Sequence, residues 1–98
     1  MLKLAAVSSE LPTTVTIPES VLWQEVGDEI VLLDVEGGEY HGLNDVGSMI
    51  WRALEEYPDV PSAYEHLCAT YEVDPDALLK DLDEFIKRLV EMGLLNTL

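Results

Sequence analysis

The chain has few positive charges: its 98 residues include 20 Asp and Glu but only 5 Lys and Arg, a formal net charge of −15. A protein that binds DNA through about 6–10 phosphate contacts would need more cations than this chain has. The same negative field opposes binding to an anionic membrane surface. The composition therefore predicts no nucleic acid and no membrane as partner. It favours a basic partner, unless the acidic surface serves solubility alone.

Cysteine and long apolar runs are also scarce. The single Cys68 cannot form an internal disulfide, which is typical of a protein in a reducing compartment. No apolar run is long enough to cross a bilayer, and the short one within residues 1–12 makes a poor signal sequence. We therefore expect a cytoplasmic protein. The 48% of apolar residues predicts one folded domain over residues 13–98, after a flexible lead-in over residues 1–12.

The first half of the chain has the composition of short strands. Residues 21–26 and 29–35 flank Gly27-Asp28, a two-residue link that is typical of a hairpin. Residues 29–35 are apolar on both faces, as expected of a central strand whose two faces are at least partly covered. The short, polar segment 39–43 has the character of an edge strand. The β-branched segment 13–18 can form another short edge strand.

Three helices are predicted after these strands. Asn44 is a good N-cap for the first, which should end before Pro58. The second should begin near Pro61. The third has a strong start signal in Asp74-Pro75 and a C-cap in Gly93. Strands followed by helices predict an α+β domain, with a small antiparallel sheet against a helical layer.

Candidate catalytic and metal-binding groups are few. Cys68 and His66 are too close in sequence to act as nucleophile and base, since residues two apart on a helix point about 200° away from each other. Cys68 lies on the apolar side of the second predicted helix, which favours a buried structural thiol. His41 and His66 lack further ligands apart from Cys68, so structural or surface roles are favoured. We expect no catalytic residue, no metal and no cofactor, and hence no enzyme.

Two features remain without a structural explanation: the edge strand at 39–43, and a third helix whose apolar stripe is wider than one helix contact needs. Placed side by side, they would form a groove with backbone N–H and C=O groups on one wall and apolar pockets on the other. Such a groove accepts an extended peptide as an added strand. Alternatively, the stripe packs on the first two helices and the edge stays bare, or pairs with a second copy in a homodimer.

The string LLD…GGEYHGLNDVGSMIW, with GLL just after the last helix, resembles the PqqD-like family. These are the recognition domains, or RiPP recognition elements, of pathways that modify ribosomally made peptides. The matching residues are Leu33-Asp34, Gly38, Tyr40, Leu43-Asn44, Gly47, Ile50-Trp51 and Gly93-Leu94-Leu95, within about residues 20–95. The resemblance implies a winged-helix-like fold, in which a three-stranded antiparallel sheet precedes three helices. It also implies that the leader segment of a precursor peptide adds as a strand beside the third strand.

The resemblance also implies the leader-peptide-binding residues. The strand wall would be Gly38, Glu39, Tyr40, His41, Gly42 and Leu43, and the helix wall Leu78, Leu82, Phe85, Ile86 and Leu89. The pattern Tyr-x-x-Leu-Asn…Ile-Trp is most similar to the lasso-peptide branch of the family. In that branch the domain hands the leader, with a Tyr-x-x-Pro-x-Leu pattern, to a separate cysteine leader peptidase, and a macrocyclase closes the ring. A PqqD-type peptide chaperone for a radical enzyme is the alternative.

Overall fold

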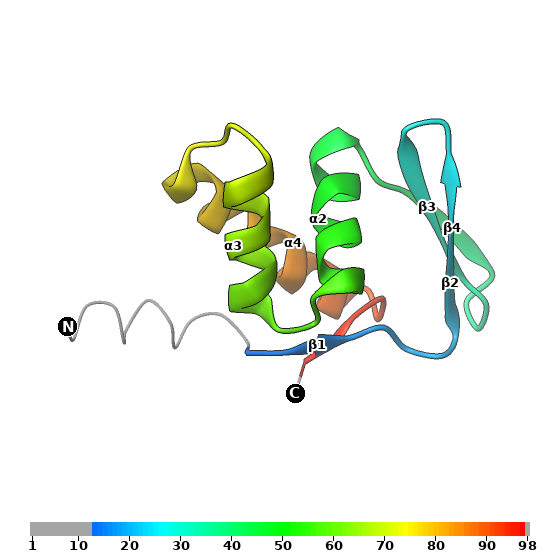
Figure 1. The fold of residues 1–98 in the computed structure, drawn as a ribbon. Coiled ribbons are helices and arrows are strands. Elements are labelled where there is room, and N and C mark those ends of the chain that lie inside the picture. The colour runs from blue at the N-terminus through cyan, green and yellow to red at the C-terminus, as the bar shows by residue number, and fades with distance from the viewer. Residues whose placement is uncertain (1–12, 98) are drawn as a thin grey trace.

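The computed structural model describes residues 13–97 (Figure 1). Its elements are β1 (Val15–Thr16), β2 (Val21–Val26), β3 (Glu29–Asp34), β4 (Glu39–Gly42), α2 (Asp45–Glu56), α3 (Val60–Thr70), α4 (Pro75–Glu91) and β5 (Asn96–Thr97). The predicted α+β order of a three-stranded antiparallel sheet followed by three helices is confirmed. The lead-in expected over residues 1–12 lies outside the described residues.

The three-stranded sheet has the order β2-β3-β4, so β3 is central as predicted. Gly27 adopts φ +65° in the hairpin turn between β2 and β3. A second turn joins β3 to β4, where the carbonyl of Asp34 accepts from the N–H of Gly38 at 2.7 Å. The Asp34 carboxylate accepts from the N–H of Gly37 at 3.2 Å. Gly38 has φ +71°, a conformation that a side chain disfavours, and this sets the start of β4.

The segment 13–18 does form a strand, but it does not extend the main sheet. β1 pairs with β5 in a separate two-stranded antiparallel sheet, with Val15 opposite Thr97. The N–H of Val15 also donates to the carbonyl of Pro58 at 3.0 Å. Figure 1 shows this small sheet running beneath the helices. It holds the two ends of the described chain against the loop between α2 and α3.

The helices begin and end where their capping residues predict. The Asn44 side chain accepts from the N–H of Gly47 at 2.8 Å and caps α2. Asp74 caps α4, whose first residue is Pro75. The α4 helix ends before Gly93, which adopts φ +78°. The N–H of Leu94 then donates to the carbonyl of Leu89 at 2.8 Å and turns the chain back into the core.

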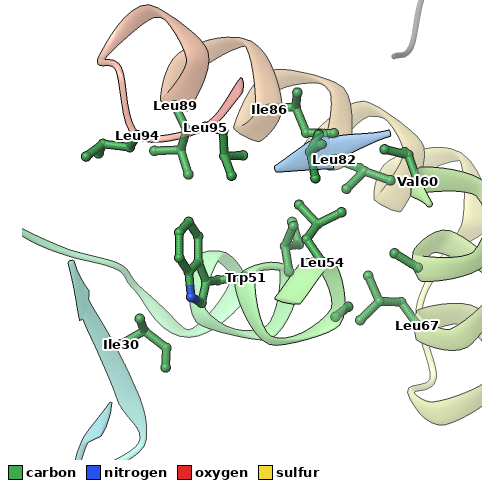
Figure 2. Close-up of a cluster of buried hydrophobic side chains, with 14 of the residues drawn as sticks. Ile30, Trp51, Leu54, Val60, Leu67, Leu82, Ile86, Leu89, Leu94 and Leu95 are labelled. Atoms are coloured by element: carbon green, nitrogen blue, oxygen red, sulfur yellow. The ribbon is translucent and has the colours of Figure 1, made fainter. Parts of the chain in front are cut away.

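The core lies between the helices and one face of the sheet. Trp51 of α2 is fully buried, and Figure 2 shows its ring between Ile30 of β3 and the leucines at the end of α4. The ring of Trp23 meets that of Trp51 edge to face, with centroids 6.4 Å apart and planes at 72°. Trp51 is thus a core aromatic.

Candidate functional site

The outer side of β4 carries backbone groups that the sheet does not use. The N–H of Leu43 donates to the carbonyl of Ile30 at 2.8 Å. The strands β3 and β4 keep the same antiparallel register from this pair back to the pair of Asp34 and Glu39. Hydrogen-bonding groups alternate in direction along an antiparallel strand. The backbone groups of Tyr40 and Gly42 therefore point away from β3. Because β4 is an edge strand, these groups face the free side of the sheet.

A buried serine fixes the end of this edge strand to α2. The Ser48 hydroxyl accepts from the N–H of Ile30 at 2.9 Å and donates to the carbonyl of Leu43 at 3.2 Å. Ser48 is the only polar residue that is buried among residues 13–97. Its hydroxyl lies between the N–H of Ile30 and the carbonyl of Leu43, the last two residues paired between β3 and β4. This contact sets the distance between the strand and the helical layer. The sequence analysis did not single out this serine.

A groove opens between β4 and α4. Its strand wall is formed by residues 40–43 and its helix wall by Phe85, Leu89 and Met92, around a hollow of about 470 Å³. Gly47 of α2 forms part of its floor. A Cβ placed on Gly47 would lie 3.2 Å from Oδ1 of Asn44, a tight contact, and 3.4 Å from Cε1 of Phe85, an ordinary van der Waals distance, so glycine chiefly leaves room for the Asn44 cap.

The groove continues between α2 and α4 as a second hollow of about 340 Å³. The two hollows share Asn44, Gly47, Phe85 and Arg88. Val46 of α2 is 45% exposed and lines the second hollow. We refer to both hollows together as the β4–α4 groove.

The structure brings together only part of the predicted site. Tyr40, His41, Gly42 and Leu43 line the groove, as do Phe85 and Leu89. Gly38 lies in the turn before β4 and Glu39 is the first residue of β4, and neither lines the groove. Leu78, Leu82 and Ile86 are buried in the core and do not line it, whereas Leu89 is likewise buried but borders the groove.

The side chains of Leu78, Leu82 and Ile86 are buried because α4 packs against both α2 and α3. The apolar width of α4 therefore serves the core, and only its side toward β4 is left for the groove. The groove residues that sequence reasoning missed are Asn44, Val46, Gly47, Ile50, Asp81, Glu84, Arg88 and Met92. Gly47 had a signal, since it belongs to the family pattern, but its place opposite Phe85 depends on tertiary structure.

One face of the three-stranded sheet is turned away from the helices (Figure 1), and it carries exposed apolar side chains. Tyr40 is 73% exposed, Leu22 55% and Val26 56%, and Val31 and Leu33 are half-buried between them. These five residues, here called the outer face, border a shallow hollow of about 590 Å³. The central strand was expected to have both faces at least partly covered; on the outer face Val31 and Leu33 are half-buried, without a helix over them in the described part of the chain.

The catalytic and metal-binding candidates are not assembled into a centre. Cys68 is half-buried rather than fully buried, and it lies beside Tyr64. Desolvation, and then the neighbouring Cys68, raise the pKa of the Tyr64 hydroxyl, which donates to the carbonyl of Pro75 at 3.3 Å. His66 stacks on Tyr57 with ring centroids 4.8 Å apart, and His41 lies 3.6 Å from the Glu39 carboxylate.

Residues 13–97 contain neither a metal-binding cluster nor a membrane-spanning helix. No group of three or more His, Cys, Asp and Glu side chains is arranged to hold a metal ion in this part of the chain. No helix within the same residues is long and apolar enough to cross a membrane.

The family described as "Coenzyme PQQ synthesis protein D (PqqD)" matches residues 29–95. The chain belongs to this PqqD family, which confirms the resemblance seen in the sequence. A comparison with curated protein sequences found no match.

Two solved structures are similar to this chain. One is described as "TbiB1 in Complex with the TbiA(beta) Leader Peptide"; it is 38% identical, with a TM-score of 0.75 over 82% of this chain and 93% of that one. The other is "Lasso peptide synthetase B1 complexed with the leader peptide", 24% identical, with a TM-score of 0.73 over 84% of this chain and 96% of that one. At that identity the second shows the shared fold alone.

Proposed function

We propose that this protein binds the leader segment of a ribosomally made precursor peptide as an added β-strand and presents it to a separate cysteine leader peptidase in lasso-peptide maturation. The observation that carries the proposal is the free backbone edge of β4 beside the apolar β4–α4 groove. The similarity to a protein whose structure was solved with a leader peptide supports it. The chain itself would supply no catalysis.

The two walls of the groove would have different roles in peptide recognition. The outward N–H and C=O groups of Tyr40 and Gly42 would bond to the backbone of the peptide, which gives affinity with little dependence on sequence. Phe85, Leu89 and Met92 would receive its apolar side chains, which gives specificity. An added strand of about 5–7 residues with two or three filled pockets suggests a Kd between micromolar and tens of nanomolar.

A precursor whose leader is bound in this way would be held close to its processing enzyme. Once the leader is held, the rest of the precursor meets a peptidase docked on the same domain at a high effective concentration. No chemical group of the recognition domain is needed for this effect. We also infer a cytoplasmic location, which the lone Cys68 supports.

We further propose that the peptidase docks on the outer face of the sheet. Large exposed apolar patches mark interaction sites, and Tyr40 belongs both to this face and to the groove. A partner seated there would therefore lie next to the captured peptide. The macrocyclase is a further candidate partner, for which we assign no surface.

Charge favours a different protein over a second copy at these surfaces. Residues 13–51 contain no Lys or Arg but eight acidic residues: Glu19, Glu25, Asp28, Glu29, Asp34, Glu36, Glu39 and Asp45. Two copies joined through their sheets would bring these like charges together. The edge-strand homodimer is therefore the weaker alternative, and measuring molecular size at two concentrations tests it. A PqqD-type role beside a radical enzyme remains the alternative within the family.

The first experiment is a fluorescence anisotropy titration of a labelled peptide with the Tyr-x-x-Pro-x-Leu pattern. We expect saturable binding, and loss of binding when alanine replaces the Tyr and Leu of the peptide. Absence of binding even at hundreds of micromolar protein would refute leader capture of this type. Equal binding of both peptides would refute the assignment of apolar pockets to the groove.

A further inference from the structure

Arg88 is a cation of the groove that forms no ion pair with any of residues 13–97. Arg52 pairs with Glu25 at 2.8 Å, and Lys87 pairs with Asp83 at 3.1 Å. Within residues 13–97, no carboxylate lies within ion-pair distance of the Arg88 guanidinium. Lys80 likewise has no ion pair among these residues, but Arg88 differs from it in lining the groove. Arg88 also borders both hollows of the groove, so its charge is present along the path of a bound peptide.

The groove changes sign of charge along α4. Asp81 and Glu84 line the hollow between α2 and α4, whereas Arg88 reaches the hollow beside β4. With a rise of 1.5 Å per helical residue, Arg88 lies about 6 Å along the helix axis from Glu84 and about 10 Å from Asp81. An extended peptide covers these distances in about two to three residues. A peptide that ran along α4 through both hollows would therefore meet both signs within one short stretch.

We propose that the groove selects peptides by a charge pattern, in which an acidic side chain lies at Arg88 and a basic side chain lies two or three residues away, beside Glu84 and Asp81. This proposal rests on peptide capture in the groove and specifies the peptide chemically. The planar guanidinium of Arg88 is free to bind a carboxylate through two N–H groups, a geometry that arginine favours.

The net charge of the protein predicts the opposite preference. A formal charge of −15 repels every acidic residue of a peptide and attracts every basic one, whatever its position. At physiological salt such long-range effects are screened beyond about 8 Å, whereas a direct pair with Arg88 is screened much less. Acidic residues should therefore weaken binding at most positions and strengthen it at the position beside Arg88.

Arg88 also has a simpler structural role to separate from this one. It lies in the last turn of α4, where a positive charge interacts favourably with the helix dipole. That role stabilises the helix equally with every peptide. Only direct recognition makes the effect of Arg88 depend on the position of a charge in the peptide.

The test uses labelled Tyr-x-x-Pro-x-Leu peptides with uncharged residues at all other positions, and a series in which one Glu or one Lys is placed at each of those positions in turn. Each peptide is titrated by anisotropy with the wild-type protein, Arg88→Gln and Lys80→Gln. Lys80 is the matched control, because it is an exposed cation on the same helix and does not line the groove.

We expect one Glu position to strengthen binding to the wild type by about 3- to 10-fold. Arg88→Gln should abolish this gain, Lys80→Gln should keep it, and Arg88→Glu should prefer Lys at that same position. A Lys two or three residues away should also strengthen binding. Thermal unfolding of each variant shows whether the effect arises from the fold.

The outcomes separate this inference from the proposed function. If the uncharged peptide binds but no Glu position strengthens binding, or if Lys80→Gln removes the gain as fully as Arg88→Gln does, the charge pattern is refuted and peptide capture stands. If no peptide binds, peptide capture itself is refuted.

Discussion

Replacing Gly42 by proline should weaken peptide binding and leave the fold intact. The N–H of Gly42 points away from β3, because its neighbour Leu43 donates inward to Ile30. Proline lacks this N–H, and edge strands tolerate proline where the N–H faces outward. The substitution therefore removes a donor that the sheet does not use and that an added strand would use.

The expected magnitude follows from the value of one backbone hydrogen bond. Such a bond contributes about 0.5–1.5 kcal/mol net, and a peptide carbonyl left without a donor costs up to about 3 kcal/mol where it is buried. Since the groove is open to solvent, we expect a loss of about 1–2 kcal/mol, which raises Kd roughly 5- to 30-fold. The substitution should not destabilise the free protein, because it removes no hydrogen bond within the sheet. Proline also reduces the conformational freedom of the unfolded chain, which favours the folded state by about 0.4–1 kcal/mol.

His41→Pro is the matched control, one residue away. The N–H of His41 faces Leu32 inside the ladder, so its loss should destabilise the protein by about 1–3 kcal/mol. Anisotropy with the Tyr-x-x-Pro-x-Leu peptide gives Kd, and thermal unfolding by circular dichroism gives Tm. The reasoning fails if Gly42→Pro binds the peptide as well as the wild type does, or if it lowers Tm as much as His41→Pro.

Three further predictions concern the core, the bridging serine and the outer face. Phe85→Ala should weaken peptide binding about tenfold. Leu82→Ala should instead lower the free energy of unfolding by about 2–5 kcal/mol, because of these two side chains only that of Leu82 is fully buried. Anisotropy and urea unfolding measure the two effects, and variants that behave alike in both would contradict the prediction. Ser48→Ala should cost about 1–3 kcal/mol in urea unfolding, because it leaves a buried N–H without its acceptor; an unchanged midpoint would argue against the bridge. Leu33→Glu should keep the peptide Kd and reduce leader cleavage by the peptidase; unchanged cleavage would exclude docking on the outer face.

Much of the fold could be predicted from the sequence because its signals are local. Gly27 and Gly38 mark turns that need positive φ, and both turns lie where expected. The side chains of Asn44 and Asp74 cap α2 and α4 by accepting from an N–H group that lies three and two residues further along the chain, respectively. Each of these signals acts within a few residues along the chain, so no knowledge of tertiary contacts was needed to read it.

The composition of the groove could not be predicted in the same way. A wide apolar stripe shows that α4 has several neighbours, but it does not show which side each neighbour covers. Leu82 and Ile86 were therefore assigned to the groove although they lie in the core. Arg88 and Gly47 line the groove only because β4, α2 and α4 meet there. The pairing of β1 with β5 likewise joins distant segments of two residues each, which carry no local pairing signal.

The edge-to-face contact between Trp23 and Trp51 gives the protein an intrinsic optical probe. These are the only two tryptophans of the chain, and one lies on the sheet and the other on α2. Their near-ultraviolet dichroism and emission therefore report whether the sheet is seated on the helical layer. Neither ring lines the β4–α4 groove, so unlabelled protein can be followed through unfolding and refolding while the peptide site is altered freely.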